Sequence, residues 1–227
     1  GEKMQYRNIV EGRFLSRPNR FIAFVETEEG EQICHVKNTG RCQELLLPGA
    51  TVYLEKSGNP ERKTAWDLVA VRKGERLFNM DSSAPNAVAG EYLRACFPDA
   101  LVFKPEKVYG NSRMDFYVET AEKKYYIEVK GVTLEEGGRA LFPDAPTERG
   151  LKHIRELIRA KEEGYGAVLL FVLQMKGCRG FCPNDRTDAA FGRALREARR
   201  RGVLVKAVEC TVEKDRLYID AEVPLLF

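Results

Sequence analysis

The sequence predicts two domains, a small all-β barrel followed by an α/β domain with a mixed sheet. Two observations predict this division. Roughly five short strands separated by turn signals occupy about the first 75 residues, whereas helical and strand patterns alternate further on. Between these regions, Asn79–Pro85 is polar and rich in breaker residues, which predicts a linker. We therefore expect a first domain over residues 1–84 and a second over 85–227.

The expected strands of the first domain end at clear turn signals. Pro48-Gly49 and the polar stretch Ser57–Pro60 are typical turn sequences, and Glu28–Glu31 joins two strands as a hairpin. This spacing is typical of a barrel of OB type, with a small sandwich as the alternative. The expected strands are Ile9–Leu15, Phe21–Thr27, Gln32–His35, Thr51–Lys56 and Thr64–Arg72.

The second domain mixes three helices with six strands. The helices are expected from Asn86 to about Cys96, from a cap at Thr147 through Glu163, and from Asp185 or Thr187 to near Arg201. Ala167–Gln174 is a near-continuous apolar run, as expected for a central strand covered on both faces. The other expected strands are Val102–Tyr109, Arg113–Glu119, Tyr125–Lys130, Val203–Cys210 and Leu217–Asp220.

Composition excludes several classes of protein. The chain has 227 residues, 44% of them hydrophobic, and a formal net charge of +3, so any nucleic-acid binding must depend on local patches. No apolar run approaches the ~20 residues of a membrane helix, and no secretory signal is visible. The six cysteines are scattered, which favours reduced thiols and a cytoplasmic location. The one close pair, Cys178 and Cys182, could bind zinc or act as a redox pair.

One expected hairpin carries charges on a strand that otherwise looks half-buried. Glu128 and Lys130 share a face of their strand, because alternate residues point the same way. A turn centred between Ala121 and Glu122 places Asp115 directly opposite Glu128, and two facing carboxylates repel unless a cation lies between them. Carboxylate oxygens suit Mg²⁺ or Mn²⁺, and Lys130 could orient a water or stabilise charge on a phosphate. The alternative is a salt-bridged solvent face of an ordinary strand.

Family motifs favour the first interpretation. The Asp…Glu-x-Lys pattern resembles the signature of the PD-(D/E)xK nuclease superfamily. Longer motifs, in order along nearly the whole chain, resemble the sugar fermentation stimulation protein (SfsA) family. These motifs are Asn38-Thr39-Gly40, Asn59-Pro60-x-Arg62-Lys63, Glu128-Val129-Lys130-x-Val132-Thr133-Leu134, Phe142-Pro143-Asp144-Ala145-x-Thr147-Glu148-Arg149-Gly150, Lys152-His153-x-x-Glu156-Leu157 and Leu170-Phe171-Val172-x-Gln174.

The resemblance implies an N-terminal OB-like barrel, a restriction-endonuclease-like α/β domain, DNA binding and a part in regulating sugar metabolism. It implies that Asp115 and Glu128 hold the metal, that Lys130 assists the nucleophile and that Gln174 helps to place water or phosphate. A Gln at this position could instead satisfy a backbone group. Related folds sometimes use a further Glu, here Glu91, although a helix-surface Glu is commoner. Gly131 departs from the family pattern, in which Asn is typical.

Several basic or polar residues are candidates for DNA contact. In the barrel, Arg62 and Lys63 lie near Trp66, and OB folds hold single strands by charge plus stacking, although Trp66 could equally belong to the core. Arg17 and Arg20, beside Phe21, form a similar group. In the second domain the candidates open a helix, whose N–H groups suit phosphate, and are Thr147, Arg149 and His153. Thr147 could be a plain cap, and we expect His153 on the polar side of its helix.

Three functions agree with the sequence. The first is a DNA-binding protein with a nuclease site dependent on Mg²⁺ or Mn²⁺. The second is a DNA-binding regulatory protein that no longer cuts, and the third is a hydrolase of a small phosphorylated molecule. No helix-turn-helix is visible. The expected partner is DNA rather than a membrane, and the oligomeric state, including a homodimer, stays open.

Overall fold

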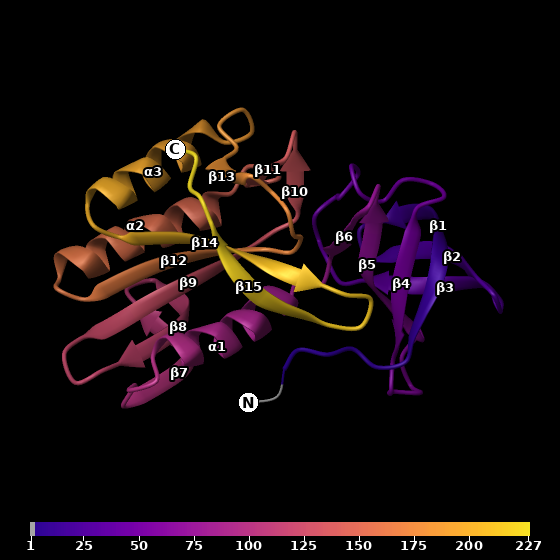
Figure 1. Ribbon diagram of the computed structural model, residues 1–227, viewed down its shortest axis with the longest axis horizontal. Helices are drawn as coiled ribbons and strands as arrows, with labels where there is room; N and C mark the ends of the chain where they lie inside the picture. Colours follow the sequence, from indigo (N-terminus) through magenta and orange to yellow (C-terminus); the bar gives the residue numbers. More distant parts are fainter. Residues whose placement is uncertain (1–2) are drawn as a thin grey trace.

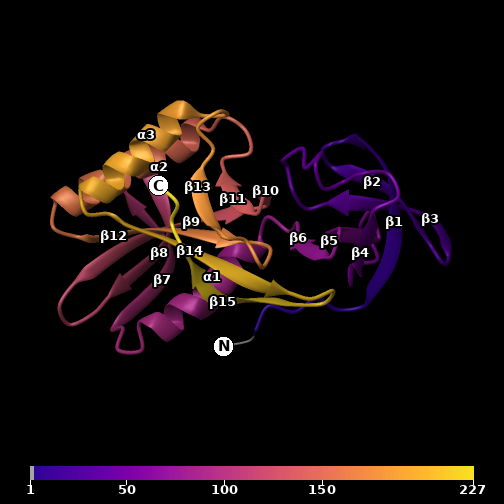
Figure 2. The same ribbon diagram turned by 45° about the horizontal axis from the view of Figure 1, so that its top comes forward.

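The computed structural model describes residues 3–227 and consists of a β-barrel beside a larger α/β domain (Figure 1). The barrel comprises the first strands of the chain, and the α/β domain begins at helix α1. The hairpin of β14 and β15 extends from the α/β domain toward the barrel in both orientations (Figures 1 and 2). No helix among residues 3–227 is long and apolar enough to cross a membrane.

The first domain is a closed five-stranded barrel. Antiparallel pairing joins β3 to β2, β2 to β1, β1 to β4 and β4 to β5, and the parallel pairing of β3 with β5 closes the ring. This closure confirms the OB-type barrel and rules out the sandwich alternative, because a sandwich would leave two separate sheets. A short β6, which the sequence did not indicate, continues from β5. The strands are β1 (Ile9–Asn19), β2 (Ile22–Thr27), β3 (Gly30–Val36), β4 (Thr51–Lys56), β5 (Trp66–Lys73) and β6 (Arg76–Asn79).

The second domain is built on a six-stranded mixed sheet in the order β15-β14-β12-β9-β8-β7. Strands β9, β12 and β14 are parallel, and every residue of β12 is buried, as its apolar sequence predicts. Helix α1 lies on one face and helices α2 and α3 on the other (Figures 1 and 2). The elements are α1 (Ala84–Cys96), β7 (Val102–Tyr109), β8 (Ser112–Glu119), β9 (Lys124–Val132), α2 (Glu148–Glu162), β12 (Gly166–Leu173), α3 (Ala189–Arg200), β14 (Leu204–Val212) and β15 (Leu217–Val223).

A small three-stranded sheet lies beside the main one and was not predicted. It consists of β10 (Leu134–Glu136), β11 (Arg139–Phe142) and β13 (Gly180–Pro183). Strands of three or four residues are too short to show a period, and β13 pairs with a strand about forty residues earlier, which no local pattern reports. Its strands β10 and β11 connect β9 to helix α2, and β13 follows β12.

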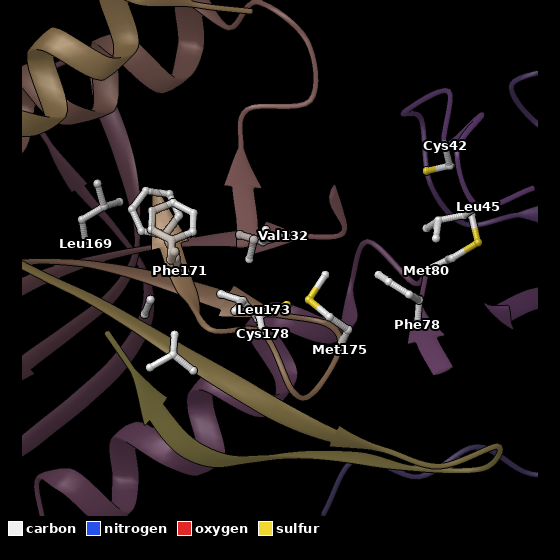
Figure 3. Close-up of a cluster of buried hydrophobic side chains, with 14 of the residues drawn as sticks. Cys42, Leu45, Phe78, Met80, Val132, Leu169, Phe171, Leu173, Met175 and Cys178 are labelled. Atoms are coloured by element: carbon white, nitrogen blue, oxygen red, sulfur yellow. The ribbon is translucent and has the colours of Figure 1, made fainter. Parts of the chain in front are cut away.

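Most of the expected linker is buried, and only Ser82 and Ser83 within it are exposed. Asn79, Met80 and Asp81 are each at most 1% exposed. Met80 and Phe78 join one continuous apolar cluster with Leu173 and Met175 of the α/β domain (Figure 3). The breaker residues therefore mark the domain boundary but form a packed seam, and sequence composition alone could not distinguish the two.

A polar network completes this seam. The Asp81 carboxylate accepts a hydrogen bond from the Tyr6 hydroxyl (2.9 Å) and lies 3.5 Å from Lys37 Nζ. Asn79 Nδ2 donates to the Tyr6 hydroxyl (2.9 Å), and Gln174 Nε2 donates to Asn79 Oδ1 (2.8 Å) and to the Asp81 carbonyl (3.0 Å). Burial and the negative charge of Asp81 raise the pKa of Tyr6. These contacts link the two domains through groups that would be costly to leave unpaired.

Candidate functional site

The hairpin of β8 and β9 brings Asp115 and Glu128 together. Phe116 pairs with Ile127, so the next position in this register pairs Asp115 with Glu128 and confirms the register predicted from the turn. Asp115 is half-buried, whereas Glu128 is 3% exposed. Asp115 Oδ2 accepts the backbone N–H of Val129 (2.8 Å), which holds the carboxylate over the neighbouring strand. The pair therefore faces the sheet surface covered by helix α2.

Lys130 lies on the same face and is held by His153 of helix α2. Lys130 Nζ donates to His153 Nδ1 (2.8 Å), because a lysine ammonium can only donate. Burial, followed by the positive charge of Lys130, lowers the pKa of His153 to about 4, so its ring is neutral near pH 7. His153 is 5% exposed, and the expectation that it lies on the polar side of its helix was wrong. His153 instead lies on the buried face of α2, together with Ile154 and Leu157.

Glu128 has an oxygen without a hydrogen-bond donor. Its Oε2 lies 3.2 Å from His153 Nδ1, but this nitrogen already accepts from Lys130 and has no proton to give. The oxygen is buried and has no hydrogen-bond partner among the described residues. Burial and the neighbouring Asp115 raise the pKa of Glu128 to about 9. This is the electrostatic state that a divalent cation would relieve.

The donor set fits a hard divalent cation rather than a soft one. Asp115 and Glu128 offer carboxylate oxygens, and Mg²⁺ characteristically binds through one or two carboxylates together with water and phosphate oxygens. No group of three or more Asp, Glu, His or Cys side chains gathers as a metal cage within residues 3–227. The two carboxylates would therefore hold a cation that keeps most of its coordination for other ligands.

Glu91 is not brought to this pair. It lines a separate cavity of about 840 Å³ that Met4 and Tyr218 also line. Burial raises the pKa of its carboxyl, which hydrogen-bonds to the Met4 backbone. Asn86, one turn earlier on helix α1, is the residue that reaches the site, where its Nδ2 donates to Asp115 Oδ1 (3.0 Å). The sequence indicated Asn86 only as the start of this helix, and that start was wrong, because the helix begins at Ala84 with Ser83 as its N-cap.

A cavity of about 420 Å³ lies beside the carboxylates and between the two domains, and we call it the interdomain cavity. It gathers motifs that are far apart in the sequence. The barrel contributes the Asn38-Thr39-Gly40 loop, and the α/β domain contributes Asn86, Gln174, parts of β9 and the segment from Phe142 to Thr147. Its lining residues are Asn38, Thr39, Gly40, Ser82, Pro85, Asn86, Val129, Gly131, Thr133, Leu134, Leu141, Phe142, Pro143, Asp144, Ala145, Pro146, Thr147 and Gln174.

Gly131 lines this cavity and packs closely against Pro85 and Gln174. A Cβ at this position would lie 2.6 Å from Pro85 Cγ and 2.7 Å from Gln174 Oε1. Any larger residue would therefore require these two side chains to move. The departure from Asn at this position thus affects the shape of the cavity wall, while Asp115, Glu128 and Lys130 keep their contacts.

Arg17 holds the barrel loop of this cavity rather than presenting a free charge. Its Nη1 donates to the carbonyls of Gly40 and Arg41, and its Nη2 donates to those of Arg20 and Asn38, each at 2.7 Å. Burial lowers the pKa of this guanidinium. Because both terminal nitrogens are committed to backbone carbonyls, the side chain fixes the Asn38-Thr39-Gly40 loop in place.

The other barrel candidates divide into paired and exposed residues. Arg62 forms a two-pronged ion pair with Asp67 (2.7 and 3.0 Å), which offsets its charge. Trp66 is 8% exposed and belongs to the core, so it offers no stacking face. Lys63 is exposed, and Arg20 is exposed with its guanidinium 5.0 Å from the ring of Phe21. Of these residues, Lys63 and Arg20 alone keep free charges.

The candidates that open helix α2 lie close to the site. Thr147 is the cap, because its Oγ1 accepts the Gly150 N–H (2.9 Å), and it also lines the interdomain cavity. Arg149 is exposed, and its charge contributes to the lowered pKa of Lys130 after burial. Cys178 and Cys182 are buried free thiols whose pKa values are raised by burial, so neither environment favours a reactive thiolate.

Fold and site together define a class of protein: an OB-type barrel packed onto a mixed-sheet α/β domain, with a carboxylate pair on the sheet and a cavity at the domain junction. A family model described as "Sugar fermentation stimulation protein RE domain" matches residues 83–216, and one described as "SfsA N-terminal OB domain" matches residues 15–80. The chain belongs to the sugar fermentation stimulation protein family.

Similar proteins span its whole length. A sugar fermentation stimulation protein homolog of Clostridium beijerinckii is 53% identical over 218 residues, covering 95% of this chain and 96% of that protein. A homolog from Desulfitobacterium hafniense is 54% identical over 215 residues, covering 94% of each. The solved structure of Pyrococcus furiosus SfsA in complex with Ca²⁺ is 26% identical, with a TM-score of 0.87 and full coverage of both chains.

Proposed function

We propose that this chain binds DNA and cleaves a phosphodiester bond with the help of a divalent cation, Mg²⁺ or Mn²⁺. The observation that carries this proposal is a buried Glu128 whose Oε2 has no hydrogen-bond donor, next to Asp115, whose carboxylate is held by the N–H of Val129. A cation bound there would supply an activated water and neutralise charge on the phosphate. The archaeal relative solved in complex with Ca²⁺ supports a divalent cation in this family.

The chain's own residues have separate parts in this proposal. Asp115 and Glu128 provide the negative charge that draws the cation, and the Val129 N–H and Asn86 fix the orientation of Asp115. Lys130 can donate a hydrogen bond to a phosphate oxygen from the same sheet face. His153 holds the Lys130 ammonium and thereby sets its position. Gln174 supports the cavity wall through its two hydrogen bonds to the seam.

A second candidate is a DNA-binding protein that regulates without cutting. Two observations favour it: the site has two carboxylates rather than a cage of three or more metal-ligating side chains within residues 3–227, and Lys130 is held by His153 rather than free. The names of the relatives point to sugar fermentation and say nothing of cleavage. This candidate predicts DNA affinity that falls steeply with salt, without turnover.

The test compares cleavage and binding in the same samples. Purified protein is incubated with single-stranded, duplex and branched DNA in Mg²⁺, Mn²⁺ or EDTA, beside an Asp115→Ala variant. Asp99→Ala, at an exposed turn after helix α1, is the matched control. We expect cleavage that needs the cation, falls by about 100-fold or more in Asp115→Ala and persists in Asp99→Ala. Binding without cleavage in every sample would favour the regulatory candidate, and absence of binding would reject both.

A further inference from the structure

Neither Asp115 nor Glu128 lines the interdomain cavity, but two residues that do line it, Asn86 and Val129, hydrogen-bond to Asp115. Asn86 lines the cavity and donates through Nδ2 to Asp115 Oδ1 (3.0 Å). Val129 also lines the cavity, and its N–H donates to Asp115 Oδ2 (2.8 Å). A phosphate bound at Asp115 and Glu128 through a cation would therefore leave the rest of its molecule at the cavity.

The charges around the cavity exclude a phosphate inside it, in addition to the one at Asp115 and Glu128. None of its lining residues within the described chain is Lys or Arg, and the one charged side chain there is the carboxylate of Asp144. The basic groups, Lys130 and Arg149, lie outside the lining. An anion would meet repulsion and no cation in the cavity, so the cavity suits the neutral part of a phosphorylated ligand.

The side-chain amide oxygen of Gln174, a hydrogen-bond acceptor in the cavity, is held in a fixed orientation. Gln174 is 2% exposed, and its Nε2 donates to Asn79 Oδ1 and to the Asp81 carbonyl. The Asp81 carbonyl requires a donor, which fixes the amide so that Oε1 points away from it. These side-chain hydrogen bonds both use Nε2, and Oε1 faces Gly131, where a Cβ would lie 2.7 Å from it. A ligand N–H group would satisfy this oxygen.

The walls of the cavity are preformed and partly apolar. Arg17 fixes the barrel loop through four carbonyls, as described above, and the opposite wall contains Pro85, Phe142 and Pro143. The volume of about 420 Å³ lies in the lower part of the range of roughly 300–1,000 Å³ for small-ligand sites. Flat apolar walls with a few fixed hydrogen-bond groups match a planar ring that carries N–H groups.

We propose that the interdomain cavity binds the base and sugar of one nucleotide, whose phosphate lies at Asp115 and Glu128. The inference rests on the proposed function, because it takes the carboxylate pair as the phosphate site. The ligand is a nucleoside phosphate, either free or as an unpaired unit of a DNA strand. A base buried in this cavity cannot be stacked in a duplex, so a DNA substrate would be single-stranded or opened at this position.

The test measures binding rather than cleavage. The full chain is titrated calorimetrically, in Ca²⁺, with dAMP, dCMP and 2-deoxyribose 5-phosphate, which carries the same phosphate and no base. We expect both nucleotides to bind more tightly than the base-free sugar phosphate by about tenfold or more. Equal affinities for the three probes would overturn the proposal, and this comparison needs no variant.

A pair of variants locates the binding. Ala145→Trp places a large ring in the cavity, and Ala121→Trp, at the exposed turn between β8 and β9, is the matched control. We expect Ala145→Trp to reduce nucleotide affinity to that of 2-deoxyribose 5-phosphate and Ala121→Trp to leave it unchanged. Equal affinities of the two variants for dAMP would overturn the proposal. Circular dichroism verifies that both are folded.

Two further arms identify the source of the nucleotide and separate this inference from the proposed function. A short single strand that competes with dAMP, while its duplex does not, identifies an unpaired DNA unit; dAMP binding without such competition identifies a free nucleotide. Both outcomes support the cavity proposal. Base-dependent binding without metal-dependent cleavage would reject the nuclease and keep the cavity. Metal-dependent cleavage together with base-independent binding would support the nuclease and reject the cavity proposal.

Discussion

The charged residues of the barrel and those of the α/β sheet differ in how they are paired. In the barrel, Arg17 directs both terminal nitrogens to backbone carbonyls, and Arg62 is matched by the carboxylate of Asp67. On the sheet, Asp115 faces Glu128, and Glu128 keeps a buried oxygen without a donor. Arg17 and Arg62 stabilise the fold through these contacts, whereas Glu128 on the sheet keeps an unsatisfied oxygen.

This difference shows which charges in a sequence are evidence for a ligand. In a sequence, a basic residue near an aromatic one resembles a nucleic-acid contact. The structure can show that the same residue is already paired within the protein. Buried polar groups are normally hydrogen-bonded, so an unsatisfied one requires an explanation such as a missing ion. By this criterion the sheet site is the stronger candidate, and Lys63 and Arg20 are the barrel residues that could still contact DNA.

The largest expected effect is on the response to metal. Replacing Glu128→Gln removes a carboxylate that would bind the cation. In Mn²⁺ at about 100 times its dissociation constant, the wild type should gain roughly 2.7 kcal/mol of stability, and the variant should gain almost none. In EDTA the variant should be at least as stable as the wild type. Thermal unfolding in both buffers measures this, with Glu91→Gln as the control that keeps the metal response. An equal metal response in Glu128→Gln would exclude this residue as a ligand.

A smaller effect is expected from Arg17→Ala, which removes the side chain that fixes the Asn38-Thr39-Gly40 loop. Four carbonyls would lose a charged donor, and we expect a loss of about 1.5–3 kcal/mol in the free energy of unfolding. Urea denaturation measures it, beside Arg17→Lys, which keeps the charge but not the two-nitrogen fork. Unchanged stability combined with a large loss of DNA affinity would show instead that Arg17 contacts phosphate.

The smallest expected effects distinguish Arg62 from its neighbour Lys63 in the barrel. Arg62→Ala leaves the buried carboxylate of Asp67 with one fewer partner and should cost about 1–3 kcal/mol of stability, without changing the salt dependence of DNA binding. Lys63→Ala should change stability by less than about 0.5 kcal/mol. If the barrel contacts DNA, Lys63→Ala lowers the slope of log affinity against log salt by about one. A lowered slope in Arg62→Ala would contradict this assignment.

Local patterns were sufficient for most elements and for the core of the site. The hairpin register followed from the position of one turn, because strand side chains alternate with a period of two, and this placed Asp115 opposite Glu128. The buried strand β12 and the capped helix α2 were equally clear. The short strands β10, β11 and β13 were missed, since their pairing is settled by contacts between distant segments.

By itself the sequence determined the barrel type, the mixed sheet, the family and the hairpin register from which the site at Asp115, Glu128 and Lys130 is proposed. Tertiary structure alone decided that Asn79–Asp81 is a packed seam, that Arg17 serves a loop, that His153 holds Lys130 and that Asn86 rather than Glu91 reaches Asp115. The physical reason is that periodicity and turn chemistry act between near neighbours along the chain. Whether a charge is paired or left free depends on groups brought together from distant parts of it.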